Sequence, residues 1–227
     1  MRVGVALKRL KLNLLPLSLL LIIPAINVSY GLLNNTIRGC HSLVTSLDMA
    51  IPFIKQFIIA YWMWFPFMFI SLVYLCFNYR NSYYKCVITM VIGMITCYII
   101  YFFFQTMVPR PVVSGNDIFS RAVRFTYSWD KPFNCFPSIH VLASYIIMMA
   151  SRKLDKKPFI KFAMNFIGIS VIVSTQFVKQ HVILDAIFAI LLAEIIYRFV
   201  AGFILERGLI WKKKLCWWLT MKKKLET

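Results

Sequence analysis

Long apolar runs are the feature that most constrains this chain. A helix needs about 20 residues to cross the roughly 30 Å hydrocarbon layer of a membrane, and hydrophobic residues make up 60% of the 227. We count six apolar windows, at 12–33, 57–77, 86–104, 136–150, 159–178 and 182–204. They predict an all-α fold: a polytopic membrane protein with six transmembrane helices in one bundle. This length suits a single membrane domain over 1–227, with no separate soluble domain.

The fourth window is short for a membrane crossing. It reaches across only if the Pro-bounded segment 132–137 also lies at membrane depth. Non-helical backbone is tolerated there only where it faces protein or water. We therefore expect this segment to border a buried site.

The basic residues are distributed unevenly, and they predict the orientation. With the N-terminus in the cytoplasm, 18 of the 26 Lys and Arg residues fall in cytoplasmic segments and 7 in outer ones. This positive-inside pattern places both termini in the cytoplasm, and the plasma membrane is the expected location. The net charge of +18 comes with no nucleic-acid recognition module, so we expect no nucleic-acid partner. The Lys- and Trp-rich tail, 205–227, suits the headgroups of anionic lipids.

Two of the three histidines open apolar runs, and an arginine closes another. If the runs cross in alternating directions, His140, His181 and Arg110 meet on one face. His181 and Asp185 are four residues apart, so on a helix they share a side and the carboxylate can fix the imidazole tautomer. The other ring nitrogen is then free to act as a nucleophile or base. A structural polar pair between helices is the simpler interpretation of these two residues alone.

The other two polar clusters contain groups that suit a phosphate ester. His140 follows a Pro-Ser turn at a predicted helix start and can protonate a leaving oxygen as a general acid. Ser138 can cap that helix, and it can also hydrogen-bond a phosphate oxygen. Arg110, between two prolines, offers a forked donor to phosphoryl oxygens. Plain capping and a contact with lipid headgroups remain open as their structural roles.

The order of these residues resembles the three signatures of the type 2 phosphatidic acid phosphatase superfamily, which contains membrane lipid phosphatases and phosphotransferases. The resemblance is carried by Arg110-Pro111, by Pro137-Ser138-Ile139-His140, and by Ser174 with His181 and Asp185. It implies a catalytic core over 86–204 with an outward-facing site. It also implies that His181 attacks phosphorus to form a phosphohistidine, that Asp185 orients it and that His140 protonates the leaving group. The phosphate ligands it implies are Arg110, Ser138 and Ser174.

The chain departs from the family pattern at two cations. Phe103 stands where the first signature has lysine, and Thr175 where the third has arginine. Arg121, Arg124, Lys131 and Lys179 are candidates to replace them. Fewer cations favour a phosphodiester, which carries one negative charge, over a monoester, which carries close to two. The preference for a phosphodiester favours the branch of the family that contains the inositol phosphorylceramide and sphingomyelin synthases. The segments 45–48 and 51–54 also resemble that branch.

Two classes of function stay open. The first is an enzyme that hydrolyses a lipid phosphate or prenyl diphosphate, or transfers a phospholipid headgroup to an alcohol. The second is a catalytically silent transporter or scaffold that retains the fold, which the missing cations would explain. The six cysteines show no metal-binding spacing, and we expect no metal and no cofactor. Cys40 and Cys135 both fall on the predicted outer side, where a disulfide is conceivable.

Overall fold

The computed structural model describes residues 13–35 and 39–205. Within these residues the protein is helical, and the only β pairing is two isolated bridges, His41 with Thr106 and Met107 with Phe133. The elements are η1 (Leu19–Leu21), α2 (Ile22–Leu33), α3 (Ser46–Ala50), η2 (Lys55–Phe57), α4 (Ile58–Trp62), α5 (Trp64–Asn78), α6 (Arg80–Phe103), α7 (Ile118–Trp129), α8 (Ile139–Ser151), α9 (Pro158–Phe177), α10 (Ile183–Phe199) and η3 (Val200–Leu205).

Four helical stretches are long and apolar enough to cross a membrane: Asn13–Leu33, Lys55–Asn78, Arg80–Phe103 and Pro158–Phe177. They match four of the six predicted windows, and with them the fold is that of an integral membrane protein. The other two windows also form helices, but they are shorter. α8 has 13 residues, and α10 has 17 and carries Asp185, Glu194 and Arg198. The predicted count of six crossings is therefore not confirmed.

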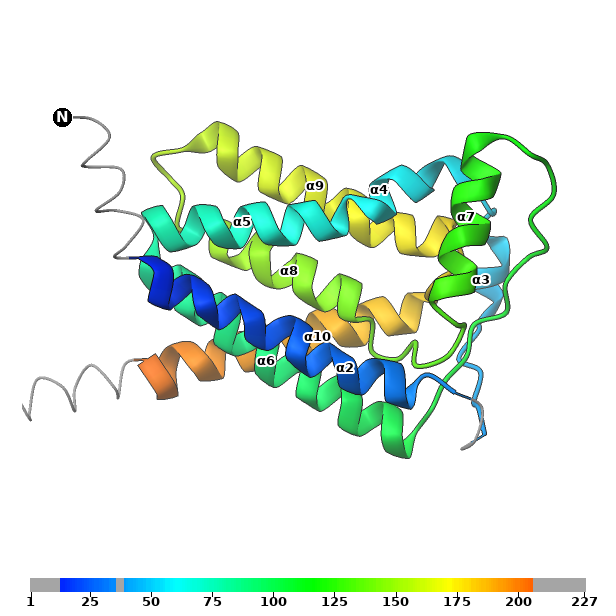
Figure 1. The fold of residues 1–227 in the computed structure, drawn as a ribbon, viewed down its shortest axis with the longest axis horizontal. Coiled ribbons are helices and arrows are strands. Elements are labelled where there is room, and N and C mark those ends of the chain that lie inside the picture. The colour runs from blue at the N-terminus through cyan, green and yellow to red at the C-terminus, as the bar shows by residue number, and fades with distance from the viewer. Residues whose placement is uncertain (1–12, 36–38, 206–227) are drawn as a thin grey trace, which may run out of the picture.

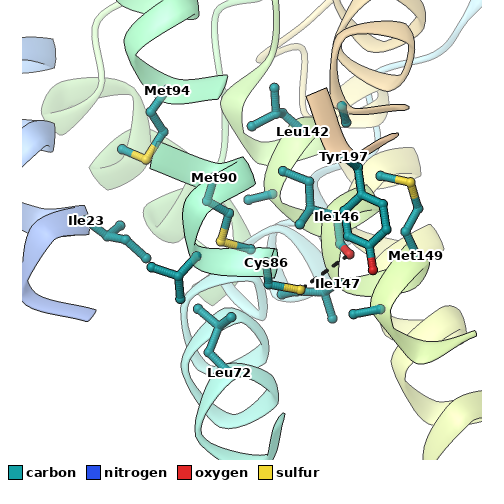
Figure 2. Close-up of a cluster of buried hydrophobic side chains, with 14 of the residues drawn as sticks. Ile23, Leu72, Cys86, Met90, Met94, Leu142, Ile146, Ile147, Met149 and Tyr197 are labelled. Atoms are coloured by element: carbon teal, nitrogen blue, oxygen red, sulfur yellow. Dashed lines mark hydrogen bonds between the residues drawn. The ribbon is translucent and has the colours of Figure 1, made fainter. Parts of the chain in front are cut away.

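Helix α8 occupies the centre of the bundle, which accounts for its short length. Ten of its residues are buried, and it packs against α5, α6, α9 and α10. Figure 2 shows this core, where Met90 and Cys86 of α6 meet Leu142 and Ile146 of α8 near Tyr197 of α10. α8 is thus surrounded largely by protein rather than lipid, so it does not need the full hydrocarbon thickness.

The helices run side by side along the long axis of the molecule, and the chain connects them at two ends (Figure 1). One end, which we call the site end, carries the described parts of 34–57 together with 104–138 and 178–182. α7 lies crosswise there, and α3 belongs to the same end. The opposite end has the short connections at Tyr79 and at 152–157. Both described ends of the chain, near residues 13 and 205, also lie at the opposite end.

Three predictions fall outside this description or differ from it. The basic tail predicted over 205–227 lies outside the described residues except for Leu205. The division into a domain over 1–227 and a core over 86–204 stays a prediction. Cys40 and Cys135 are both free, so the conceivable disulfide is absent; the Cys40 thiol instead lies 3.9 Å from Gln105 Oε1.

Candidate active site

The tight connection between α9 and α10 positions His181. Lys179 adopts a left-handed backbone conformation with φ of 52°. The amides of Gln180 and His181 both donate to the carbonyl of Thr175, at 3.0 and 3.2 Å. His181 therefore precedes α10 instead of lying on it, so the expected shared helical face is not how it meets Asp185. The two meet because Asp185 Oδ2 caps the helix, accepting from the Val182 amide at 3.0 Å.

The partners of His181 determine its tautomer. Its Nδ1 lies 3.0 Å from the Cys135 carbonyl oxygen and 3.3 Å from Asp185 Oδ2. A carbonyl can only accept a hydrogen bond, so Nδ1 carries the proton. The other nitrogen, Nε2, is then left with a free lone pair. His181 is 8% exposed and Asp185 is fully buried, which shields their interaction from water.

His140 stands on the lone-pair side of His181. It is the second residue of α8, whose N-cap Ser138 accepts from the Val141 amide at 3.3 Å. His140 Nδ1 lies 3.5 Å from His181 Nε2, and the ring sits against Tyr61 and Trp64 with centroids 4.7 and 4.5 Å away. The Ser138 amide also donates to the Asp185 carbonyl, so the starts of α8 and α10 are joined through the main chain.

Arg110 lies in the same pocket as His181 and is held by α7, by Asp130 at its end and by Gln180. Its guanidinium donates to the carbonyls of Tyr127 and Asp130 and to Gln180 Oε1, and it lies 4.5 Å from the Tyr127 ring centroid. Its Nε is buried without a hydrogen-bond partner among the described residues, and so is Gln180 Nε2. Two buried donors without partners are costly unless a ligand satisfies them. Burial raises the pKa of the Tyr127 phenol to about 12, although Arg110 opposes the shift.

Lys179 and Asp48 connect the segment 45–51 to the α9 to α10 connection and the start of α10. We call this set of contacts the clamp. Lys179 Nζ donates to the carbonyls of Asp48 and Ile51 at 2.9 and 2.6 Å. Asp48 Oδ1 accepts from the Ile183 amide at 2.8 Å, at the start of α10, while Oδ2 accepts from Thr45. Burial alone would raise the pKa of Asp48, but the hydrogen bonds from Thr45 and Ile183 hold it below its usual value. Burial lowers the pKa of Lys179, with Asp48 opposing.

A pocket of about 320 Å³ lies at the site end; Arg110, Lys179 and His181 line it, whereas His140 and Asp185 do not. Its walls are formed by the 44–53 segment, the Pro-Arg-Pro segment, and the α9 to α10 connection. The polar side chains among its lining residues are Asp48, Arg110, Gln176, Lys179 and His181. With two cations against one carboxylate, an amide and an imidazole, the pocket carries a net positive charge that suits an anionic group such as a phosphate ester.

Of the four candidate replacements for the missing cations, only Lys179 lines the pocket. Arg124 is turned to the carbonyls of Val113 and Gly115, and Arg121 and Lys131 are exposed. Phe103 points outward with 80% of its surface exposed. Thr175 is buried, and its hydroxyl donates to the Ile172 carbonyl.

The two predicted serine ligands do not line the pocket. The Ser138 hydroxyl acts as the cap of α8, which sequence reasoning had left open as its structural role. The Ser174 hydroxyl donates to the Val171 carbonyl within its own helix at 2.6 Å. Both side chains are fully buried. Their role as phosphate ligands stays a prediction.

Sequence reasoning missed several residues of the site. Asp48 entered the sequence analysis only as part of the segment 45–48, and Gln176, Gln180 and Tyr61 gave no signal. Cys135 was also missed: its ligand atom and those of His181 and Asp185 lie within 4.8 Å of one another, an arrangement that could hold a metal ion. Burial raises the pKa of the Cys135 thiol, and Asp185 adds to the shift. The residues come from separate segments, so no local spacing indicates them.

Comparison with known proteins gives one match. The sequence profile of the PAP2 superfamily, the type 2 phosphatidic acid phosphatases, matches residues 40–199. No curated protein and no solved structure matches the chain. The match covers more than half of the chain and begins upstream of the predicted core at 86, so it includes the segment that contributes Asp48. The chain belongs to the PAP2 superfamily, and this membership indicates a membrane enzyme of the lipid phosphatase and phosphotransferase type.

Proposed function

We propose that this protein transfers or hydrolyses a lipid phosphate ester through a phosphohistidine on His181. The observation that carries the proposal is the tautomer of His181: two acceptors on Nδ1 leave the lone pair of Nε2 directed away from Asp185. A buried carboxylate behind the ring also stabilises the positive charge that develops when Nε2 attacks.

The proposed reaction has two steps. In the first, Nε2 of His181 bonds to phosphorus while the bond from phosphorus to the leaving oxygen breaks, and His140 gives that oxygen its proton. In the second, water or an alcohol attacks phosphorus, its proton passes to His140, and the nitrogen–phosphorus bond breaks. Phosphorus must fit between His181 Nε2 and the leaving oxygen, and this oxygen must be hydrogen-bonded to the His140 ring. The facing nitrogens of the two rings therefore need to be roughly 6 Å apart. The 3.5 Å separation means that the His140 ring turns aside when the substrate enters.

The donor we propose is a phosphodiester lipid, as in headgroup transfer. Lys179 is the only described replacement for the missing cations in the pocket, and its ammonium group already donates to two carbonyls. The guanidinium of Arg110 also donates to three acceptors, but its Nε and the neighbouring Gln180 amide nitrogen have no partner among the described residues and are available for phosphate oxygens. One cation balances the single charge of a diester better than the double charge of a monoester.

The test uses purified protein in detergent with labelled lipids. We expect release or transfer of the phosphoryl group by the wild type, its loss in His181→Ala, and normal turnover in Lys161→Ala at the opposite end. The diester should have a kcat/KM comparable to or above that of phosphatidic acid or a prenyl diphosphate. A monoester preference of tenfold or more would overturn the donor assignment. Turnover of no lipid at all would favour the catalytically silent alternative.

We also propose that the site end faces outward from the plasma membrane, with both termini in the cytoplasm. The 18 to 7 distribution of basic residues supports this orientation. The segments counted as cytoplasmic include the connections at the opposite end (Figure 1). In a background without accessible native thiols, a cysteine at Ser114 should react with an impermeant thiol reagent from outside, and one at Asp155 should not. The reverse labelling would contradict the orientation.

A further inference from the structure

Helix α7 differs from the bundle helices in its direction. It lies crosswise at the site end, while the apolar spans run along the long axis (Figure 1). It begins after Asp117, whose side chain accepts from the amides of Phe119 and Ser120 at 3.1 Å. If the spans cross the bilayer, a crosswise helix at their ends runs near the plane of the membrane surface.

One face of α7 is apolar and uncovered. Ile118, Ala122, Phe125 and Trp129 are spaced by four, three and four residues, so they align along one side of the helix. Ile118, Phe125 and Trp129 are 68%, 56% and 78% exposed. The protein-facing side is different, since it contains the buried Ser120, Val123 and Thr126. A stripe of large apolar side chains this exposed is unfavourable in water.

This stripe continues the lipid-facing surface of a span. The Phe125 ring meets the Trp62 ring edge-on, with centroids 6.3 Å apart. Trp62 ends α4 within the span Lys55–Asn78, and its indole nitrogen donates to the Thr126 hydroxyl at 2.9 Å. Tryptophan rings concentrate at the level of lipid headgroups, where the ring is apolar and the N–H is satisfied. Trp62 and the neighbouring stripe therefore occupy the depth of the membrane interface.

A third side of α7 is polar. Arg121 and Ser128 are exposed there, and Arg124 lies on the same side. α7 thus has one side packed against the protein, one apolar side and one basic side. Such a division is typical of a helix that lies in the membrane interface. The Arg121 side chain then points to water and to lipid phosphates, with its apolar stem along the helix, while Arg124 donates to the carbonyls of Val113 and Gly115.

The protein-facing side of α7 also reaches the proposed site. Tyr127 accepts a hydrogen bond from Arg110 at its carbonyl, and its ring lies under the guanidinium. Its hydroxyl donates to the Val178 carbonyl at 2.7 Å, beside the connection that carries His181. The depth of α7 in the interface therefore sets the position of Arg110.

We propose that α7 is an interfacial helix, with the stripe Ile118, Phe125 and Trp129 inserted in the headgroup layer of the leaflet at the site end. The lipid surface itself is what covers this stripe. Through Tyr127, this insertion holds Arg110 at the level where the phosphate of a membrane lipid lies. The consequence for turnover rests on the proposed function, whereas the position of the helix does not.

The position is tested with the full chain in phospholipid vesicles. Nitroxide labels are placed at Phe125→Cys and, three residues on, at Ser128→Cys, in a background without accessible native thiols. We expect oxygen, which concentrates in lipid, to relax the label at 125 more than a water-soluble nickel complex does, and the label at 128 to show the reverse. Equal access of the nickel complex to both labels would overturn the proposal. Shielding of the 125 label from both reagents would also overturn it, in favour of a second copy of the chain.

The consequence for turnover is tested with a matched pair of neighbouring substitutions. Trp129→Glu places a charge in the stripe, and Ser128→Glu places the same charge on the polar side. We expect Trp129→Glu to lower kcat/KM on lipid in vesicles several-fold and Ser128→Glu to leave it unchanged. Equal effects of the two variants would contradict the link between α7 and the site. If the wild type turned over no lipid, the proposed function would fail while the labelling result would still decide where α7 lies.

Discussion

The two ends of the bundle differ in the burial of their carboxylates. At the site end, Asp48 and Asp185 are buried. Both oxygens of Asp48 accept hydrogen bonds, whereas Asp185 accepts through Oδ2 and its Oδ1 has no partner among the described residues. At the opposite end, the Lys161–Asp155 pair is exposed, with Asp155 78% accessible, and its members are six residues apart. A buried carboxylate is costly unless its hydrogen bonds are satisfied, whereas an exposed pair contributes little either way. The site end therefore holds two buried carboxylates in fixed positions beside the candidate site, which the exposed pair at the opposite end does not do.

The largest expected effect comes from the buried carboxylate behind His181. Asp185→Asn keeps the shape of the side chain but loses the charge that favours a proton on Nδ1. We expect kcat to fall by about 10³- to 10⁴-fold while lipid binding persists, as for the orienting carboxylate of a catalytic triad. Steady-state kinetics measures this, with Asp155→Asn as the control at the opposite end. A variant with near wild-type kcat would show that the carboxylate does not orient the nucleophile.

The second-largest effect on turnover is expected from the forked guanidinium group of Arg110. Arg110→Lys keeps the charge but cannot reach the carbonyls of Tyr127 and Asp130, Gln180 and a phosphate oxygen together. We expect about a 10²-fold loss of kcat/KM. Arg121→Lys, the same exchange at an exposed position of α7, should change little. Equal kinetics of the two variants would remove Arg110 from the phosphate site.

A smaller effect is expected at the clamp between 45–51 and α10. Asp48→Ala removes the acceptor for the Ile183 amide and loosens the turn that carries His181. We expect roughly a tenfold loss of kcat with little change in KM, because small displacements of a catalytic group are costly. Asp117→Ala removes a similar helix cap from α7 without a contact to the pocket, and its kcat should stay closer to the wild type. The reverse order would mean that the clamp does not position the site.

The smallest effect is the response of this clamp to acid. The folded protein holds the pKa of Asp48 below its usual value, so the charge stabilises the fold fully above about pH 4, the usual value for an unfolded chain. That stability is lost as the pH falls through the lowered pKa of the folded protein. Asp48→Asn should therefore be less stable near neutral pH, by about 1 kcal/mol, with the difference shrinking in acid. Thermal unfolding in detergent at several pH values measures it; a constant difference would contradict the lowered pKa.

The sequence predicted the helical segments and the grouping of His140, His181 and Asp185 because both depend on local patterns. The catalytic roles of these three residues stay a prediction. Apolar runs mark helices directly, and the four long spans fall within a few residues of their windows. His140, His181 and Asp185 were found because each stands at the start of an apolar run. Glu194 and Arg198 of α10, which are four residues apart, also form an ion pair at 2.8 Å.

The remainder of the site depends on contacts that no local pattern reveals. Asp48 meets Ile183 across 135 positions, and Lys179 meets the Asp48 carbonyl across 131. Lys179 was therefore only one of four candidate cations, and of these four only Lys179 lines the pocket. The contact between His181 and Asp185 was expected, but the structure makes it through a helix cap, since α10 begins after His181. A spacing of four residues fits both arrangements.

The most direct test of the account is to trap the phosphorylated enzyme. Protein mixed briefly with a lipid donor labelled in its phosphate is denatured in base, where a phosphohistidine survives, and the labelled peptide is sequenced by mass spectrometry. We expect phosphate on His181, no labelled protein from His181→Ala, and slower labelling when His140 is replaced by Gln. Phosphate on another residue, or full turnover by His181→Ala, would contradict it.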